Sequence, residues 1–84
     1  MKIVWDEPKR LANLDKHGLD FADLNETFFD NSLVVQSHSN CWRGIGKTIR
    51  GVIVVVFVKL GREAVSVISM RPASRDERKL YADA

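Results

Sequence analysis

Cysteine is nearly absent from this chain of 84 residues, which contains only Cys41. A single cysteine cannot form an internal disulfide, and with two histidines the chain has no cluster of cysteines and histidines spaced to bind zinc. The N-terminus lacks the sustained apolar stretch of a signal peptide, and no apolar run is long enough to span a bilayer. We therefore expect no metal, no cofactor and no membrane partner, and a cytoplasmic location.

Cations are scarce in the first part of the chain, and anions are scarce in the rest. Residues 1–30 carry four cations against seven anions, a net charge of −3, and the remainder carries nine cations against four anions, a net charge of +5. This asymmetry predicts that any nucleic-acid contact lies in the second half and that a basic partner would dock elsewhere. Mixed surface charge without a ligand explains the charge counts equally well.

The composition is that of an ordinary soluble globular protein, with 45% hydrophobic and 29% charged residues. Dividing 84 residues would leave each part too small to bury an adequate core, so the sequence predicts one domain over residues 1–84. The opening "MKIVW" predicts a strand. A helix is predicted from Glu7 to His17, with Asp6 as N-cap and Pro8 in its first turn. Gly18 is suited to end this helix in the left-handed conformation.

A second helix is predicted to begin directly afterwards. Asp20 is a suitable N-cap, and Phe21, Leu24 and Phe28 recur at helical spacing, which predicts one apolar face packed on the core. Asp30 and Asn31 are expected to close it.

From Leu33 onward the pattern changes to short β-prone runs separated by turn residues. The runs "LVVQ", "WRGIGKTI", "GVIVVVFVK" and "AVSVISM" predict four strands, and the turns near Gly51 and Gly61 favour antiparallel hairpins. The segment "VIVVVFV" is apolar at every position, so both of its faces should be covered. The helices can cover one face, and the other needs the C-terminal segment, a second protomer or a different protein.

The segment "ASRDERKLY" predicts a C-terminal helix. Ser74 and Glu77 match the S-x-x-E capping box, and Leu80 and Tyr81 are expected on the apolar side. Arg75, Arg78 and Lys79 are spaced to face one direction. Arg71 precedes the helix at the end of a strand, and Pro72 separates the two elements.

Two segments together resemble the BrnT family of type II toxins: "VWDEPKRLANLDKHGLDF" at the front and "ISMRPASRDERKLY" at the back. The resemblance implies an α+β, RelE-like fold, in which an N-terminal strand and two helices pack on a small antiparallel sheet of about four strands, with a short C-terminal helix. It also implies an RNA-cleaving toxin that is neutralised by a BrnA-type antitoxin, and operator DNA that is reached indirectly through that antitoxin. A hetero-oligomer is expected, with a homodimer as an alternative when the chain is alone.

The motif carries over to named positions, and the chain departs from it at others. The matched residues are Trp5, Asp6, Lys9, Asn13, Lys16, His17, Gly18 and Phe21 at the front, and Ser69, Arg71, Ala73, Glu77, Arg78 and Tyr81 at the back. Members commonly have an arginine at Ser66, an alanine at Met70 and a polar residue at Pro72, and another arginine near Cys41 or Trp42. The loss of a cation at Ser66 leaves open a catalytically weak binding protein that represses its own operon with an antitoxin. A plain nucleic-acid-binding module is a third alternative.

Metal-free RNA cleavage requires a base for the 2′-hydroxyl, donors for the charge that develops on the phosphate, and an acid for the leaving oxygen. Arg71 and Arg78 are the first candidates as phosphate donors, because guanidinium groups bind two phosphate oxygens at once. The structural alternative is an ion pair with Glu77 or Asp76. Arg75, Lys79 and Lys16 are candidates for contacts to the RNA backbone.

The proton-transfer groups are less well specified by the sequence. His17 has a suitable intrinsic pKa, but capping the carbonyl groups of its helix is the preferred interpretation. Tyr81 is a candidate for proton transfer or base stacking, with burial against Leu80 as the alternative. Glu77 is interpreted as a capping residue rather than a catalytic carboxylate, Trp5 as core, and His38 as surface.

Overall fold

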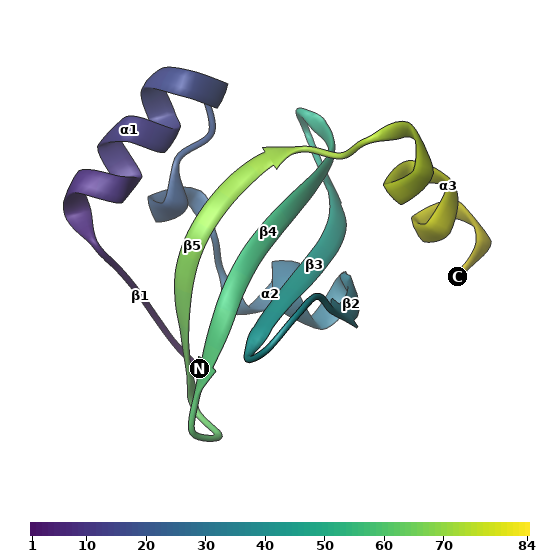
Figure 1. Cartoon of the computed structure of the whole chain (residues 1–84). Coiled ribbons are helices and arrows are strands. Elements are labelled where there is room, and N and C mark those ends of the chain that lie inside the picture. Colours follow the sequence, from purple (N-terminus) through teal and green to yellow (C-terminus); the bar gives the residue numbers. More distant parts are fainter.

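The computed structural model describes residues 1–84 and is an α+β fold in which helices flank a strongly curved sheet (Figure 1). None of the helices has the length and apolar character that crossing a membrane requires. The elements, in chain order, are β1 (Lys2–Trp5), α1 (Glu7–His17), the 3₁₀ turn η1 (Phe21–Asp23), α2 (Glu26–Asn31), β2 (Leu33–Gln36), β3 (Cys41–Thr48), β4 (Gly51–Leu60), β5 (Ala64–Pro72) and α3 (Arg75–Asp83).

The sheet has five strands in the order β1-β5-β4-β3-β2. The antiparallel meander predicted for β2 to β5 is confirmed, and a bulge interrupts the β4–β5 register between Val56 and Phe57. The predicted count of four was low, because β1 adds a fifth strand parallel to β5, with Ile3 opposite Val65 and Trp5 opposite Val67. Turn residues in a sequence reveal hairpins, whereas a parallel pair joins distant segments and leaves no local pattern.

Helix α1 begins and ends where the sequence predicts. Pro8 lies in its first turn, and Gly18 ends it with a φ of 69° and an N–H bonded to the carbonyl of Leu14. Asp6 has the extended backbone of an N-cap, but its side chain makes no capping hydrogen bond. The stop at Gly18 therefore depends on backbone conformation, which glycine adopts without a steric penalty.

The continuous second helix predicted for residues 20–31 is wrong. Asp20 does accept a hydrogen bond from the Ala22 N–H, but only the short turn η1 follows, and Leu24 returns to an extended conformation. The Asn25 side chain then accepts from the Phe28 N–H and starts α2 afresh. Asparagine competes with helix continuation by bonding the backbone a few residues ahead, which explains the break.

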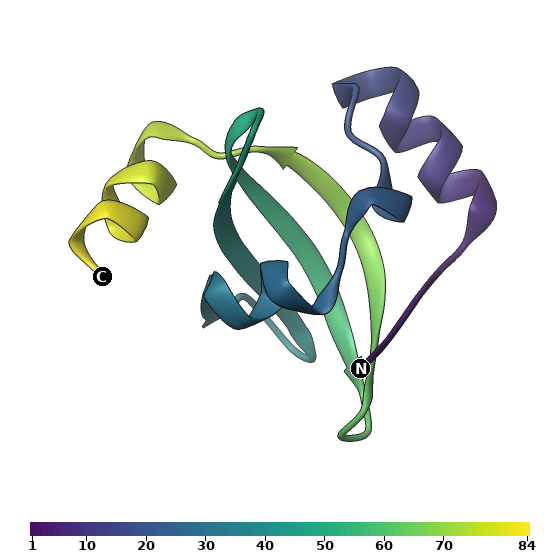
Figure 2. The same cartoon turned by 180° about the vertical axis from the view of Figure 1, so that it is seen from behind.

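One face of the sheet, hereafter the covered face, lies beneath α1, η1 and α2 (Figure 2). The main core forms here from buried side chains that are at most 7% exposed: Leu19, Phe21, Phe29, Ile53, Val55, Phe57, Val65, Val67 and Met70. Trp5 packs on this core, edge to face with Phe21, which confirms its interpretation as core. Gly46 lets α2 approach closely, since a Cβ there would lie 2.7 Å from the Phe28 ring.

The opposite face, hereafter the open face, is only partly covered by α3 (Figure 1). Tyr81 of α3 packs against a small cluster formed by Ile45, Val54 and Ala73. The predicted apolar side of α3 is half right, because Leu80 points away and is 46% exposed. The remaining part of the open face consists of half-buried side chains in two rows across the strands: Val4, Ser66, Val58 and Cys41, then Ser69, Val56, Arg43 and Val35.

Candidate functional site

Two arginines on the open face converge on one carboxylate of α3. Arg43 of β3 pairs with Val56 and Arg71 of β5 pairs with Val54, so both side chains leave the same face on either side of β4. Strands lie about 4.8 Å apart, so about 10 Å separates the two outer strands at this point. Long guanidinium side chains span such a gap, and Glu77 in the first turn of α3 lies where they meet.

The Glu77 carboxylate accepts four hydrogen bonds. Its Oε1 accepts from Arg71 Nη1 at 2.7 Å and from the Ser74 N–H at 2.9 Å. Its Oε2 accepts from Arg43 Nη1 at 2.7 Å and from Arg71 Nη2 at 2.9 Å. The Ser74 hydroxyl in turn accepts from the Glu77 N–H, which completes the predicted capping box. The cap therefore also fixes the position of both arginines.

The electrostatics of this cluster keep Glu77 ionised. The fork from Arg71 is the main cause that holds the pKa of Glu77 far below its usual range, with the Ser74 N–H and Arg43 adding to it against the effect of burial. The hydrogen bond from Glu77 raises the pKa of Arg71. A carboxylate held this firmly in its charged form is a poor proton acceptor near neutral pH, so the geometry favours a positioning role over a catalytic one.

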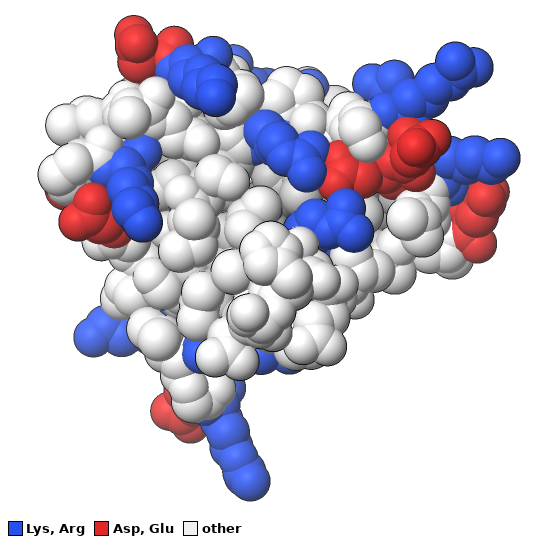
Figure 3. All heavy atoms as spheres, viewed as in Figure 1, with Lys and Arg blue, Asp and Glu red and all other residues white.

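The arginines remain accessible from the open face. The Glu77 side chain is 6% exposed, whereas those of Arg43 and Arg71 are 29% and 35% exposed. Two cations share one anion, so the cluster keeps a net positive charge, and the buried Nε of Arg43 has no hydrogen-bond partner. Figure 3 shows blue and red side chains together at the upper part of this face, beside a broad area without charge. The cluster can therefore bind an anion through its exposed N–H groups.

The structure separates the two arginines that the sequence singled out. Arg71 makes an ion pair with Glu77, which was the predicted structural alternative to a phosphate-binding role. Arg78 is exposed on α3 and makes no ion pair or side-chain hydrogen bond. The same is true of Arg75 and Lys79. Arg78 follows Glu77 directly, and successive helical residues do not share a face, so Arg78 borders the cluster without belonging to it.

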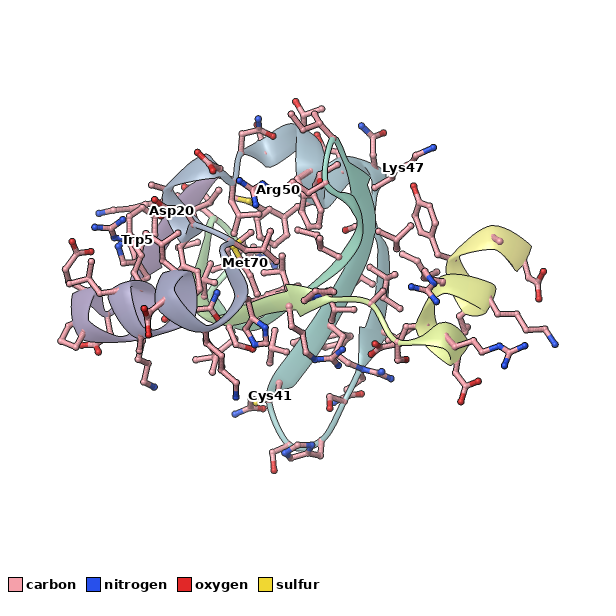
Figure 4. The ribbon with its side chains drawn as sticks, turned by 90° about the horizontal axis from the view of Figure 1, so that it is seen from above. Trp5, Asp20, Cys41, Lys47, Arg50 and Met70 are labelled. Atoms are coloured by element: carbon pink, nitrogen blue, oxygen red, sulfur yellow. The ribbon has the colours of Figure 1, made fainter.

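Tyr81 is half-buried, and it packs on Val54 and its neighbours while Leu80 is exposed. It also lies at the rim of a groove of about 600 Å³ between residues 19–31 and the β3–β4 hairpin. Figure 4 shows Arg50 on the side of the hairpin where Met70 and Asp20 lie, and Lys47 on the other side. The groove thus lies mainly on the covered face, with Tyr81 reaching it from the open face.

His17 and Lys16 lie at the end of α1, which is far from α3 in all ribbon views (Figures 1, 2 and 4). The structure therefore does not bring His17 together with Arg78 or Tyr81. His17 is half-buried and Lys16 is exposed, and neither makes a side-chain hydrogen bond. His38 lies exposed in the β2–β3 loop with its ring bonded to Ser37, as expected of a surface residue.

Arg43 is the residue that the sequence interpretation missed as part of a site. The available signal was a charged residue within the strand "WRGIGKT", flanked by Trp42 and Gly44. Its partner Glu77 is 34 positions away, and only the register of three neighbouring strands brings the two together. No group of three or more histidine, cysteine or acidic side chains is arranged to hold a metal ion.

Comparisons with known proteins agree with this architecture. Residues 5–77 match the family model of the ribonuclease toxin BrnT of type II toxin–antitoxin systems. The crystal structure of the Brucella abortus ribonuclease toxin BrnT is similar, with 50% sequence identity and a TM-score of 0.82, covering 89% of this chain and 99% of the Brucella chain. A comparison with curated protein sequences returns no match. This chain belongs to the BrnT family of ribonuclease toxins of type II toxin–antitoxin systems.

Proposed function

We propose that this chain is a metal-independent endoribonuclease that inhibits translation and growth in the cytoplasm, and that a BrnA-type antitoxin neutralises it. Family membership supports a ribonuclease toxin with an antitoxin partner. The observation that carries the finer proposal is the pair of accessible arginines held by Glu77 on the open face. The antitoxin would also connect the complex to operator DNA.

The proposed chemistry is attack of a ribose 2′-oxygen on the adjacent phosphorus. The O2′–P bond forms and the P–O5′ bond breaks, which leaves a 2′,3′-cyclic phosphate and a 5′-hydroxyl. Arg71 and Arg43 would stabilise the negative charge that develops on the phosphate oxygens. Their geometry is set in advance, because the Glu77 carboxylate fixes both guanidinium groups before RNA arrives.

The surrounding residues would complete the site. Arg75, Arg78 and Lys79 on the exposed side of α3 would contact the RNA backbone, through interactions that weaken with salt. Tyr81, close to this side of the sheet, is the proposed proton-transfer residue. His17 and Lys16 would act only on a longer stretch of RNA that reaches the end of α1.

The test is cleavage of RNA in the presence of chelator by wild type, Arg71→Ala and Arg43→Ala. Loss of one charge-stabilising donor is expected to lower the rate about 100-fold. Arg62→Ala is the matched control, since Arg62 is an exposed arginine in the β4–β5 turn, outside the cluster. Equal degradation by all four proteins would point to a contaminant or to the wrong residues. Arg78→Ala is expected to weaken RNA binding more than turnover.

A second candidate is a catalytically weak BrnT-like protein that acts within an antitoxin complex to repress its operon. The observation that favours it is Ser66, which lies on the open face between Val4 and Val58, where family members commonly carry an arginine. Ser66→Arg adds a cation to the same face as Arg71 and is expected to raise cleavage if this departure limits it. An unchanged rate would remove Ser66 as the reason for weak activity.

A further inference from the structure

The groove between residues 19–31 and the β3–β4 hairpin connects two groups of candidate site residues that the fold holds apart. At one end Tyr81 lines the groove, and it lies four positions after Glu77, so the two side chains share one face of α3. At the other end Leu19 lines it, directly after the helix stop at Gly18. The volume of about 600 Å³ is that of a small-ligand site.

Two cations line this groove without a partner. Lys47 and Arg50 are exposed, and neither side chain makes an ion pair or a hydrogen bond. Arg43 and Lys47 are four positions apart on β3, so Lys47 leaves the sheet on the same open face as Arg43. Arg50 lies near the end of α1, since a Cβ on Gly18 would be 3.6 Å from its Nη1. Free cations along the groove favour an anionic ligand such as an RNA backbone.

The groove also offers surface on which a base can pack. Leu24, Phe28 and Tyr81 line it and are half-buried, so part of each side chain faces the groove or solvent. The bases of single-stranded RNA stack on aromatic side chains and pack against apolar ones. An apolar wall beside free cations suits a nucleotide, which has a flat base and a charged backbone.

Asp23 supplies a free hydrogen-bond acceptor in the same groove. The other acidic residue there, Asp20, is already bound by Arg10 at 3.0 Å and by the Ala22 N–H at 2.9 Å. The Asp23 side chain is exposed and makes no ion pair or hydrogen bond. A carboxylate accepts from two neighbouring N–H groups at once. Guanine has such a pair on its Watson–Crick edge, whereas adenine presents one donor beside an acceptor, and uracil one donor between two acceptors.

We propose that this groove holds a guanine of the RNA substrate next to the cleavage site, with Asp23 as the residue that selects the base. Lys47 and Arg50 would contact the flanking phosphates. This inference rests on the proposed function for RNA as the ligand. The groove would set the sequence preference, while the arginines at Glu77 act on the phosphate whatever the base.

The proposed path also explains how distant residues can act on one RNA. The strand would run from the arginine cluster at Glu77 past Tyr81, through the groove, and out beside Arg50 at the end of α1. Lys16 lies two positions before Gly18, so a strand that leaves the groove there would reach it. The separation of α1 from α3 is then the length of the RNA-binding surface.

The experiment measures binding of three trinucleotides, UGU, UAU and UUU, to the full chain by NMR titration. Each carries 2′-O-methyl groups, which block the attacking oxygen, so binding is measured without cleavage. UGU is expected to shift the backbone amides of Asp23, Gly46 and Thr48 and to bind about tenfold more tightly than UAU. UAU is the matched ligand, since adenine has a similar stacking area without the paired donors. Equal affinities, or shifts confined to the arginine cluster, would overturn the proposal.

Variants of the groove test the role of each side chain. Asp23→Asn should reduce the affinity for UGU to that for UAU, and Asp30→Asn, an exposed acid of α2 outside the groove, should preserve the preference. Arg50→Ala should weaken all three ligands equally, since phosphate contacts carry no base information, and Arg62→Ala is its control. A guanine preference that persists in Asp23→Asn would overturn the assignment of that residue.

Asp23→Ala is a second variant that removes the carboxylate altogether, and circular dichroism with thermal melting verifies that each variant is folded. The outcome is separable from that of the nuclease proposal. Tight binding of UGU in the groove by a chain that cleaves no RNA would refute the nuclease and leave the groove assignment standing. Cleavage by a chain that binds the three trinucleotides equally would refute the groove assignment alone.

Discussion

Strand β4 contributes side chains to both the covered and the open face of the sheet, and the two faces differ in how far these side chains are buried. On the covered face, Val55 and Phe57 are at most 2% exposed and pack beneath three helical segments. On the open face, the alternate residues Val56 and Val58 are half-buried beside a charged cluster. The first arrangement contributes most of the hydrophobic stabilisation, and the second leaves arginines and aliphatic groups partly exposed to solvent. Adjacent residues of one strand thus lie in a closed core and on a partly exposed surface.

The largest expected difference between the faces is in core truncation. Phe57→Ala removes a ring packed edge to face against Phe29 and is expected to lower the free energy of unfolding by about 3–5 kcal/mol. Val58→Ala, one position along the strand, is expected to cost less than about 1 kcal/mol, because its side chain is already partly exposed. Urea unfolding of both variants measures the difference. Equal losses would show that the open face is as important to stability as the core.

Glu77 connects α3 to the open face through its bonds to Arg43 and Arg71, and we expect it to stabilise the fold. Glu77→Gln removes the anion that holds Arg43 and Arg71 while keeping the shape of the side chain, and it is expected to cost about 1–3 kcal/mol. The matched control is Asp76→Asn on the same helix, since Asp76 is exposed and unpaired. If the two changes have the same effect in urea unfolding, Glu77 does not anchor α3 to the sheet.

The close approach of α2 on the covered face depends on Gly46. Gly46→Ala is expected to cost about 1–3 kcal/mol, because the new Cβ would lie 2.7 Å from the Phe28 ring. Gly44→Ala should cost less, since its nearest neighbour, the Ser32 hydroxyl, lies 3.3 Å away and can rotate. Adding Phe28→Leu to Gly46→Ala should recover part of the loss. Failure to recover would show that backbone conformation, rather than the ring, requires glycine.

The smallest expected effect is a dependence of stability on acid pH. The pKa of Glu77 is lowered in the folded state, so its contribution is fully present above its unfolded pKa of about 4.5 and is lost as pH falls below that value. Glu77→Gln should therefore flatten the fall in stability between pH 5 and pH 3. Glu7, whose pKa Arg10 lowers to about 2, gives a weaker background because it is exposed. If the free energy of unfolding changes with pH in the same way in wild type and in Glu77→Gln, Glu77 does not cause the loss of stability in acid.

Local sequence patterns were sufficient to predict most of the helices, strands and turns. The hairpin turns at Gly51 and Gly61, the stop at Gly18 and the capping box at Ser74 depend on residues that are neighbours in the chain, and all of them occur as predicted. The second helix was mispredicted, since the spacing of Phe21, Leu24 and Phe28 suits a helix but does not require one. These three side chains reach the core through a 3₁₀ turn and a short helix instead.

The candidate site was harder to predict than the fold. The motif identified Arg71 and Glu77 but gave no sign that Arg43 would complete their cluster. It also grouped His17 with the C-terminal residues, although α1 and α3 lie on opposite sides of the molecule (Figure 1). Residue type indicates what chemistry a side chain can perform. Whether two such side chains meet depends on strand order and register.

The sequence by itself determined the ends of α1, the start of α3, the meander and the presence of an all-apolar strand, because each depends on residues close along the chain. It also determined the family, through the types and spacing of residues in its first and last segments. Only the tertiary structure decided which face of that strand the helices cover, that β1 joins β5, and that two arginines share Glu77. An apolar strand is equally suited to packing on either face. Which face is buried depends on where the chain's other elements reach, and that depends on contacts between segments far apart in sequence.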